Sequence, residues 1–131
     1  YLTDYASKHH IRIMWASFSP ITPPGSNFEH RSVVMNSNWH NPKEFIFQLA
    51  HEISHVIHGD KGDVFYYHAC YTGKESVEYK ANVGAVKLLV PFFCRELDKP
   101  YANPHRFMSA FSVPSYLADV VTEEIKKYYA E

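Results

Sequence analysis

The chain has 131 residues, of which 46% are hydrophobic and 21% charged, and its formal net charge is −1. This length fits one domain with a single core, so we expect residues 1–131 to form one domain rather than two. A charge near zero excludes a general attraction to nucleic acid or to acidic membranes, and no apolar run has the length of a membrane span. We therefore expect no direct nucleic-acid partner and no membrane association.

The N-terminal part of the chain is predicted to form one helix and two strands. Residues 1–10 have the composition of the end of an amphipathic helix. Residues 11–17 alternate in polarity and are rich in β-formers, which predicts a strand. Residues 18–28 contain three prolines and a glycine and are predicted to be a loop. Residues 31–35 are predicted to form a second short strand, with a turn at 36–38.

Residues 45–59 (FIFQLAHEISHVIHG) are predicted to form an amphipathic helix. Asn41 and Pro42 supply a start signal as N-cap and first helical residue, and Glu44 stands close to the place of a capping-box partner. Gly59 supplies a stop signal beyond the last turn. Apolar residues recur at helical spacing through the segment: Phe45, Ile46, Leu49, Ile53, Val56 and Ile57.

The remainder of the chain is predicted to be mainly helical. Residues 60–73 are expected to form a loop or a small hairpin, whose aromatic residues would add a strand at the edge of the sheet. Residues 74–90 are predicted to form a second long helix that ends at Pro91. A short helix at 104–111 and a terminal amphipathic helix at 114–129 complete the chain.

Each of the last two long helices carries an apolar face. In the helix at 74–90, Gly84 and the alanines would permit close approach to the helix at 45–59. The apolar stripe of that helix comprises Val77, Ala81, Gly84, Ala85, Leu88 and Leu89, and the inward face of the terminal helix comprises Leu117, Val120, Val121, Ile125 and Tyr128. These elements predict an α+β domain, mainly helical, with a short sheet of about three strands packed against the helix at 45–59.

The helix at 45–59 contains the pattern H-E-x-x-H, formed by His51, Glu52 and His55. Residues four apart lie one turn apart on the same helix face, so both histidines can offer a ring nitrogen to one metal ion. Glu52 would project beside the metal, where a general base can take a proton from a water molecule. Three positions can match by chance, but a buried His-Glu-His cluster without a metal would be costly.

A catalytic zinc ion usually keeps three protein ligands and one open position, so a third ligand is needed. The pattern H-E-x-x-H-x-x-G-x-x-H fails, because Lys61 stands at the third histidine and His58 at the glycine. His58 lies on the flank of the ligand face, and we expect it to face solvent or to contact a ligand residue rather than the metal.

The alternative is a carboxylate from the helix at 74–90, where Glu75 and Glu78 both qualify by position. We favour Glu78 over Glu75, because Asn82 follows Glu78 by one helical turn. Asn82 could accept a hydrogen bond from the far nitrogen of a ligand histidine and so fix its tautomer.

The segments H-E-I-S-H and E-Y-K-A-N-V-G-A-V-K-L-L-V-P, in this order, resemble the ImmA/IrrE family of small zinc metallo-endopeptidases, as does the F-S-V-P-S stretch at 111–115. The resemblance implies a zincin-like fold and a gluzincin-like ligand set. In that set His51, His55 and Glu78 hold the zinc ion and Glu52 is the catalytic acid. The chain departs from the family at Gly84 and Val90, where a bulky aromatic residue and a methionine are usual, and both are packing positions.

The resemblance also implies a class of substrate. Members of the family often occur in phages and mobile elements, and several act on a partner helix-turn-helix repressor, which relieves repression of transcription. We therefore expect a protein partner of this kind, cleaved in the cytoplasm. Two cysteines without metal-like spacing, Cys70 and Cys94, and the absence of a visible secretory segment predict free thiols in a reducing compartment.

The expected reaction is metal-assisted peptide hydrolysis, in which Glu52 takes a proton from water and returns it to the leaving amine. The tetrahedral oxyanion needs a further donor, and Tyr66, Tyr67 and His68 are candidates. The strand at 31–35 could bind an extended substrate by strand addition.

The competing hypothesis is a non-catalytic, zinc-stabilised regulatory module that binds the repressor without cutting it. A structural zinc is more often closed by four Cys or His ligands, whereas this set leaves one position open. The intact Glu52 also favours the enzyme, because a structural site has no use for a general base.

Overall fold

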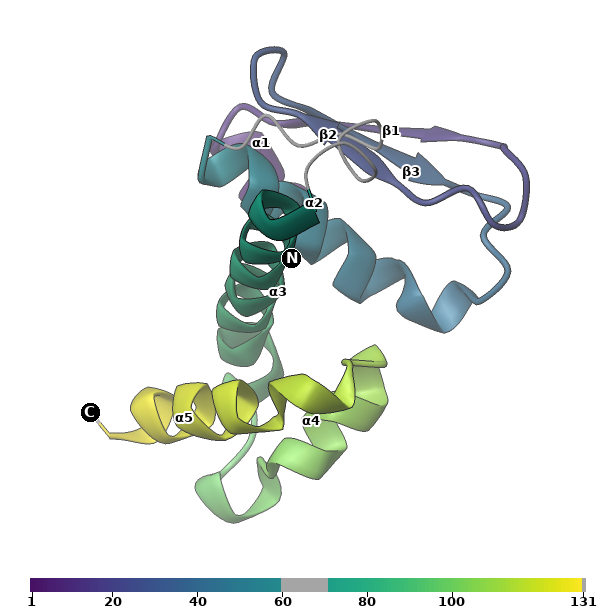
Figure 1. Cartoon of the computed structure of the whole chain (residues 1–131). Helices are drawn as coiled ribbons and strands as arrows, with labels where there is room; N and C mark the ends of the chain where they lie inside the picture. Colours follow the sequence, from purple (N-terminus) through teal and green to yellow (C-terminus); the bar gives the residue numbers. More distant parts are fainter. Residues whose placement is uncertain (60–70, 131) are drawn as a thin grey trace.

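The computed structural model describes residues 1–59 and 71–130, and for residues 71–76 it describes the backbone alone. The described residues form an α+β domain with a three-stranded sheet, which confirms the predicted class (Figure 1). None of the described helices combines the length and the apolar composition that a membrane span needs. In chain order the helices and strands are α1 (Leu2–Lys8), β1 (Arg12–Ala16), β2 (Gly25–Asn27), β3 (Ser32–Asn36), α2 (Phe45–Ile57), α3 (Tyr71–Cys94), α4 (Pro104–Phe111) and α5 (Ala118–Tyr129).

The sheet has the order β1-β3-β2, with β1 parallel and β2 antiparallel to β3. The prediction of a loop at 18–28 was therefore wrong in part, because Gly25–Asn27 pairs with the central strand. A strand of three residues shows no periodicity, so its pairing is decided by the open backbone groups of β3. The prediction that the strand at 31–35 receives a substrate by strand addition was also wrong, since both of its edges are already paired.

Helix α2 covers the sheet, and Val33 and Met35 of β3 are fully buried in the core beside it. Its start is as predicted: the Asn41 side chain accepts a hydrogen bond from the Lys43 amide and caps a short 3₁₀ turn, η1 (Pro42–Glu44). The predicted capping-box role of Glu44 was wrong, because its carboxylate accepts a hydrogen bond from Trp39 Nε1 at 2.8 Å instead.

The predicted stop signal at Gly59 is confirmed. Helix α2 ends at Ile57, and Gly59 has φ +73°, a left-handed conformation that a glycine adopts without steric cost.

Helix α3 is longer than predicted at both ends: it begins at Tyr71 rather than at residue 74, and it passes through Pro91 and continues to Cys94. A proline in a helix interior costs about 3 kcal/mol, which led us to expect a stop there. The extra turn is stabilised by burial. Phe93 packs edge-on against Phe107 and Phe111, with ring centroids 5.4 and 6.2 Å apart, and Cys94 is 1% exposed. A large apolar side chain contributes about 1.5–3 kcal/mol when fully buried. Phe93 is partly buried and contributes less, and the buried Cys94 adds to its share in offsetting the proline.

The C-terminal helices α4 and α5 match the predicted boundaries closely. Asn103 caps α4 by accepting a hydrogen bond from the Arg106 amide at 2.8 Å. Helix α5 follows a 3₁₀ turn, η4 (Ser115–Leu117). The inward position of Tyr128 was predicted wrongly, since this residue is exposed while Tyr129 donates a hydrogen bond to the Leu97 carbonyl. The buried stripe repeats every four residues along Leu117, Val121, Ile125 and Tyr129, and Tyr128 falls outside it.

In Figure 1 the sheet lies above α2, and the α4–α5 pair lies below it. Helix α3 crosses α2 and contacts α5, so it joins these two parts. The crossing is tight because Gly84 faces Ser54: a Cβ atom added at Gly84 would overlap Ser54 Oγ and lie 2.9 Å from Ser54 Cβ. The predicted close approach of the two helices at Gly84 is therefore confirmed.

Candidate metal centre

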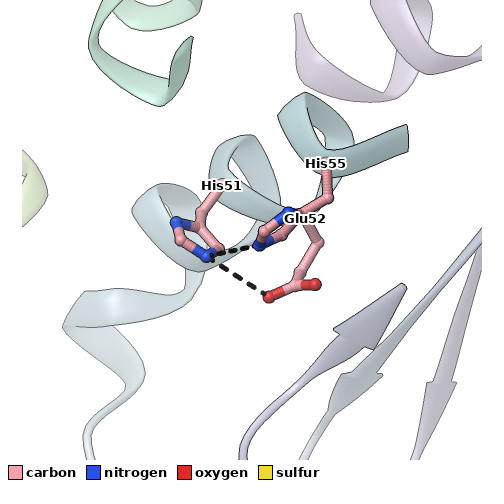
Figure 2. A group of neighbouring side chains, drawn as sticks. All are labelled: His51, Glu52 and His55. Carbon is pink, nitrogen blue, oxygen red and sulfur yellow. Dashed lines mark hydrogen bonds and ion pairs between the residues drawn. The ribbon is translucent and has the colours of Figure 1, made fainter. Parts of the chain in front are cut away.

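Helix α2 presents His51, Glu52 and His55 from adjacent turns, and their side chains converge (Figure 2). The two Nε2 atoms of the histidines are 3.1 Å apart, and one ligand atom from each of the three residues lies within 4.8 Å of the others. All three residues are buried, with exposed fractions of 9%, 4% and 2%. The helical pairing expected from the H-E-x-x-H spacing is thus present in the fold.

Glu78 of α3 completes the cluster. Its Oε2 lies 2.9 Å from His51 Nε2, and its Oε1 lies 2.8 Å from His55 Nε2, so one carboxylate spans both rings. The structure therefore brings together all three residues predicted to hold the metal. The side chain of Glu75, the alternative ligand, lies outside the described residues.

Asn82 occupies the place expected of a partner for a ligand histidine. Its Oδ1 lies 2.7 Å from His51 Nδ1. With the amide oxygen facing it, Nδ1 of a neutral His51 carries the proton and donates it, which leaves a lone pair on Nε2. The lone pair points toward His55 Nε2 and the Glu78 carboxylate.

The donor set fits a divalent cation. The atoms of His51, His55 and Glu78 that meet at the cluster are all able to act as electron-pair donors, and two imidazoles with one carboxylate form a ligand set known for catalytic zinc. Without a positive charge at this point, lone pairs 3.1 Å apart would repel one another in a buried setting. A bound cation would supply that charge.

Glu52 lies beside these donors rather than among them. Its Oε2 is 4.0 Å from His51 Nε2, and the residue is buried between α2 and the sheet. Burial raises the pKa of the Glu52 carboxyl, and the neighbouring His51 and His55 act in the opposite direction. A carboxylate in this environment is placed to exchange a proton with a group bound near the histidines.

Two residues near this cluster were not singled out from the sequence. The Ser26 hydroxyl of β2 is buried beside the Glu52 carboxyl and lowers its pKa, although it forms no hydrogen bond of ordinary geometry with the described residues. Tyr116 accepts a hydrogen bond from Asn82 Nδ2. Ser26 was hidden in a segment predicted to be a loop. Tyr116 directly follows the F-S-V-P-S stretch, but nothing in its spacing indicates a contact with residue 82.

The family model of the IrrE N-terminal-like domain, a family of peptidases, matches residues 6–118. The chain belongs to this family. The match includes α2 and α3 and therefore every residue of the candidate metal centre. IrrE-like peptidases are metal-dependent. Membership confirms the ImmA/IrrE resemblance and implies metallopeptidase activity for this IrrE-like domain. No curated protein and no solved structure matches the chain significantly.

Of the other residues singled out from the sequence, the structure describes some and leaves others outside its described part. His58 is exposed, as predicted, and its Nδ1 lies 3.1 Å from Ser54 Oγ. The three predicted oxyanion donors (Tyr66, Tyr67 and His68), the possible edge strand in the same segment and Cys70 lie outside the described residues. Their roles stay predictions. Cys94 is a free, buried cysteine.

Proposed function

We propose that the protein is a zinc-dependent endopeptidase that cleaves a helix-turn-helix transcriptional repressor. The observation that carries this proposal is the convergence of His51, His55 and Glu78 on one point, with the Glu52 carboxylate 4.0 Å from Nε2 of His51. A purely structural metal site has no use for that additional buried carboxylate, whereas hydrolysis requires a base in this place.

His51, His55 and Glu78 would hold the zinc ion. When bound there, zinc lowers the pKa of a water molecule and polarises the carbonyl of the scissile peptide bond. Glu52 takes the proton from the attacking water at one of its carboxylate oxygens. The same residue then delivers this proton to the nitrogen of the leaving amine.

The surroundings of Glu52 suit both proton transfers. Burial raises the pKa of the carboxyl, which makes it a better base than an exposed glutamate. Positive charge at the adjacent histidines, which a bound zinc ion would supply when the rings are neutral, opposes this rise in pKa and keeps the anion accessible before the reaction. Tyr66, Tyr67 and His68 remain the proposed donors to the oxyanion.

The repressor substrate is supported by the family resemblance, in which several members of phage or mobile-element origin act on such proteins. Such a substrate places the reaction in the cytoplasm and makes the protein a regulator of transcription. Since β3 is paired on both sides, an extended substrate segment would have to use an edge of β1 or β2 that no other described strand pairs with. Strand β2 carries Ser26 beside Glu52 and is therefore the edge closer to the chemistry.

The test is to incubate the zinc-loaded protein with the purified helix-turn-helix repressor encoded beside it, with and without a chelator. We expect discrete repressor fragments, identified by mass spectrometry, that disappear when the chelator is present. A repressor that binds the zinc-loaded protein and stays intact would instead support the non-catalytic regulatory module.

A further inference from the structure

Asn82 uses both ends of its side-chain amide. The oxygen faces His51 Nδ1 at 2.7 Å, and the nitrogen donates a hydrogen bond to the Tyr116 hydroxyl oxygen. Helix α3 holds the backbone of Asn82, but the side chain is only half-buried, so packing alone does not fix its rotamer.

The two hydrogen bonds form one directional chain. With a metal on His51 Nε2, the ring proton must reside on Nδ1, so Asn82 must present its oxygen to the ring. Its NH₂ group then points to Tyr116, whose oxygen can accept. Tyr116 therefore stabilises the one amide orientation that suits a metal-bound His51.

Tyr116 reaches this position from a distant part of the chain. It lies in η4, 34 residues beyond Asn82, and is 61% exposed. Its neighbour Leu117 is fully buried and anchors the turn. The Tyr116 ring stacks on Tyr79 of α3, with ring centroids 6.4 Å apart and an interplanar angle of 28°. Because the Tyr116 side chain is exposed, burial does not fix its orientation. The hydrogen bond of its hydroxyl and the stacking of its ring are the contacts that hold it.

We infer that Tyr116 is a positioning residue for the metal centre, acting through Asn82 on His51. This inference rests on the zinc site of the proposed function. Loss of a direct hydrogen-bond partner of a metal ligand typically weakens metal binding 10- to 100-fold. Tyr116 is one hydrogen bond further from the metal ligand than Asn82, and it acts through a single neutral hydrogen bond. We therefore expect loss of the Tyr116 hydroxyl to weaken zinc binding by about 3- to 10-fold.

The experiment compares the zinc dissociation constants of purified variants, measured by competition with a chromophoric chelator. Tyr116→Phe removes only the hydroxyl and keeps the ring stacked on Tyr79. Tyr79→Phe is the matched control: it alters the other ring of the same exposed pair, and its hydroxyl makes no hydrogen bond with any other described residue. Circular dichroism of each metal-free variant verifies that the fold is retained.

We expect Tyr116→Phe to raise the zinc dissociation constant about 3- to 10-fold and Tyr79→Phe to change it by less than about 2-fold. The double variant Tyr116→Phe/Asn82→Ala should bind zinc no more weakly than Asn82→Ala alone, because both changes break the same chain. Equal effects of the two tyrosine variants, or losses that multiply in the double variant, would overturn the inference. So would a wild-type protein that binds no zinc.

Zinc affinity needs no substrate, so this outcome is separate from the cleavage test. A protein whose zinc affinity depends on Tyr116 but which leaves the repressor intact would contradict the proposed function and leave the inference standing.

Discussion

The tight crossing of α2 and α3 gives a quantitative prediction for Gly84→Ala. On an isolated helix this change is favourable by about 1 kcal/mol, because alanine has the higher helix propensity. In this fold the new methyl group would overlap Ser54 Oγ and lie 2.9 Å from Ser54 Cβ. Optimal separations between carbon atoms are about 3.5–4.0 Å, so the crossing is too close by roughly 0.6–1.1 Å.

The overlap cannot be relieved by side-chain rotation alone. Ser54 Oγ can move to another rotamer, but both Cβ atoms are fixed to helical backbone. The helices must therefore separate. Overpacking of a buried contact costs about 1–3 kcal/mol, and this case belongs near the upper end because backbone must move. After subtracting the propensity gain, we expect a net loss of about 2 kcal/mol, which lowers the melting temperature by roughly 5–10 °C.

The same separation would reach the metal centre. Helix α2 carries His51 and His55 while α3 carries Glu78 and Asn82, so the distances between these ligand groups depend on the crossing. We expect Gly84→Ala to weaken zinc binding about as much as loss of an outer hydrogen-bond partner does, 10- to 100-fold.

Denaturant unfolding of the metal-free protein measures the loss of unfolding free energy in Gly84→Ala. Two double variants that also change Ser54 test whether the contact between the two Cβ atoms causes this loss. Ser54→Gly combined with Gly84→Ala should restore most of the lost stability, because it removes the opposing Cβ. Ser54→Ala combined with Gly84→Ala should restore little, because the 2.9 Å contact between Cβ atoms remains. A Gly84→Ala protein as stable as wild type, with unchanged zinc affinity, would refute the reasoning.

Two further predictions concern the third ligand and the cysteines. Glu78→Ala should lose most of the bound zinc in metal analysis, while Glu75→Ala keeps it; the reverse result would make our ligand assignment wrong. Cys94 should resist alkylation in the native protein, because it is 1% exposed and burial raises the pKa of its thiol. In denaturant without reductant, mass spectrometry should then show labels on both Cys70 and Cys94, whereas an unlabelled pair would indicate a disulfide.

The arrangement of the side chains at the candidate site was largely predictable from the sequence, because it depends on local spacing. His51 and His55 are one helical turn apart, and that distance alone predicts a shared metal. Glu78 and Asn82 are likewise one turn apart. In the structure they contact the two ring nitrogens of His51, Nε2 and Nδ1 respectively. Periodicity and capping residues located α2, α4 and α5 within a few positions for the same reason.

The missed features depend on contacts between distant segments. The three residues of β2 show no period, and their pairing follows only from the unpaired edge of β3. Ser26 and Tyr116 meet Glu52 and Asn82 across the fold, so no local pattern could indicate them. Pro91 shows the opposite case: the local rule predicts a helix end, but the ring packing of Phe93 and the burial of Cys94 stabilise a further turn.

The most direct test of the central claim uses Glu52→Gln, which keeps the shape of the side chain and removes the base. Zinc content, stability and repressor cleavage are measured side by side for this variant and for wild type. Loss of a general base typically costs about 10²- to 10⁴-fold in rate. We predict that the variant keeps its full zinc content and that its rate of repressor cleavage falls by at least about 10²-fold. A Glu52→Gln protein that cleaves the repressor as fast as wild type would contradict the claim that this buried carboxylate performs the proton transfers.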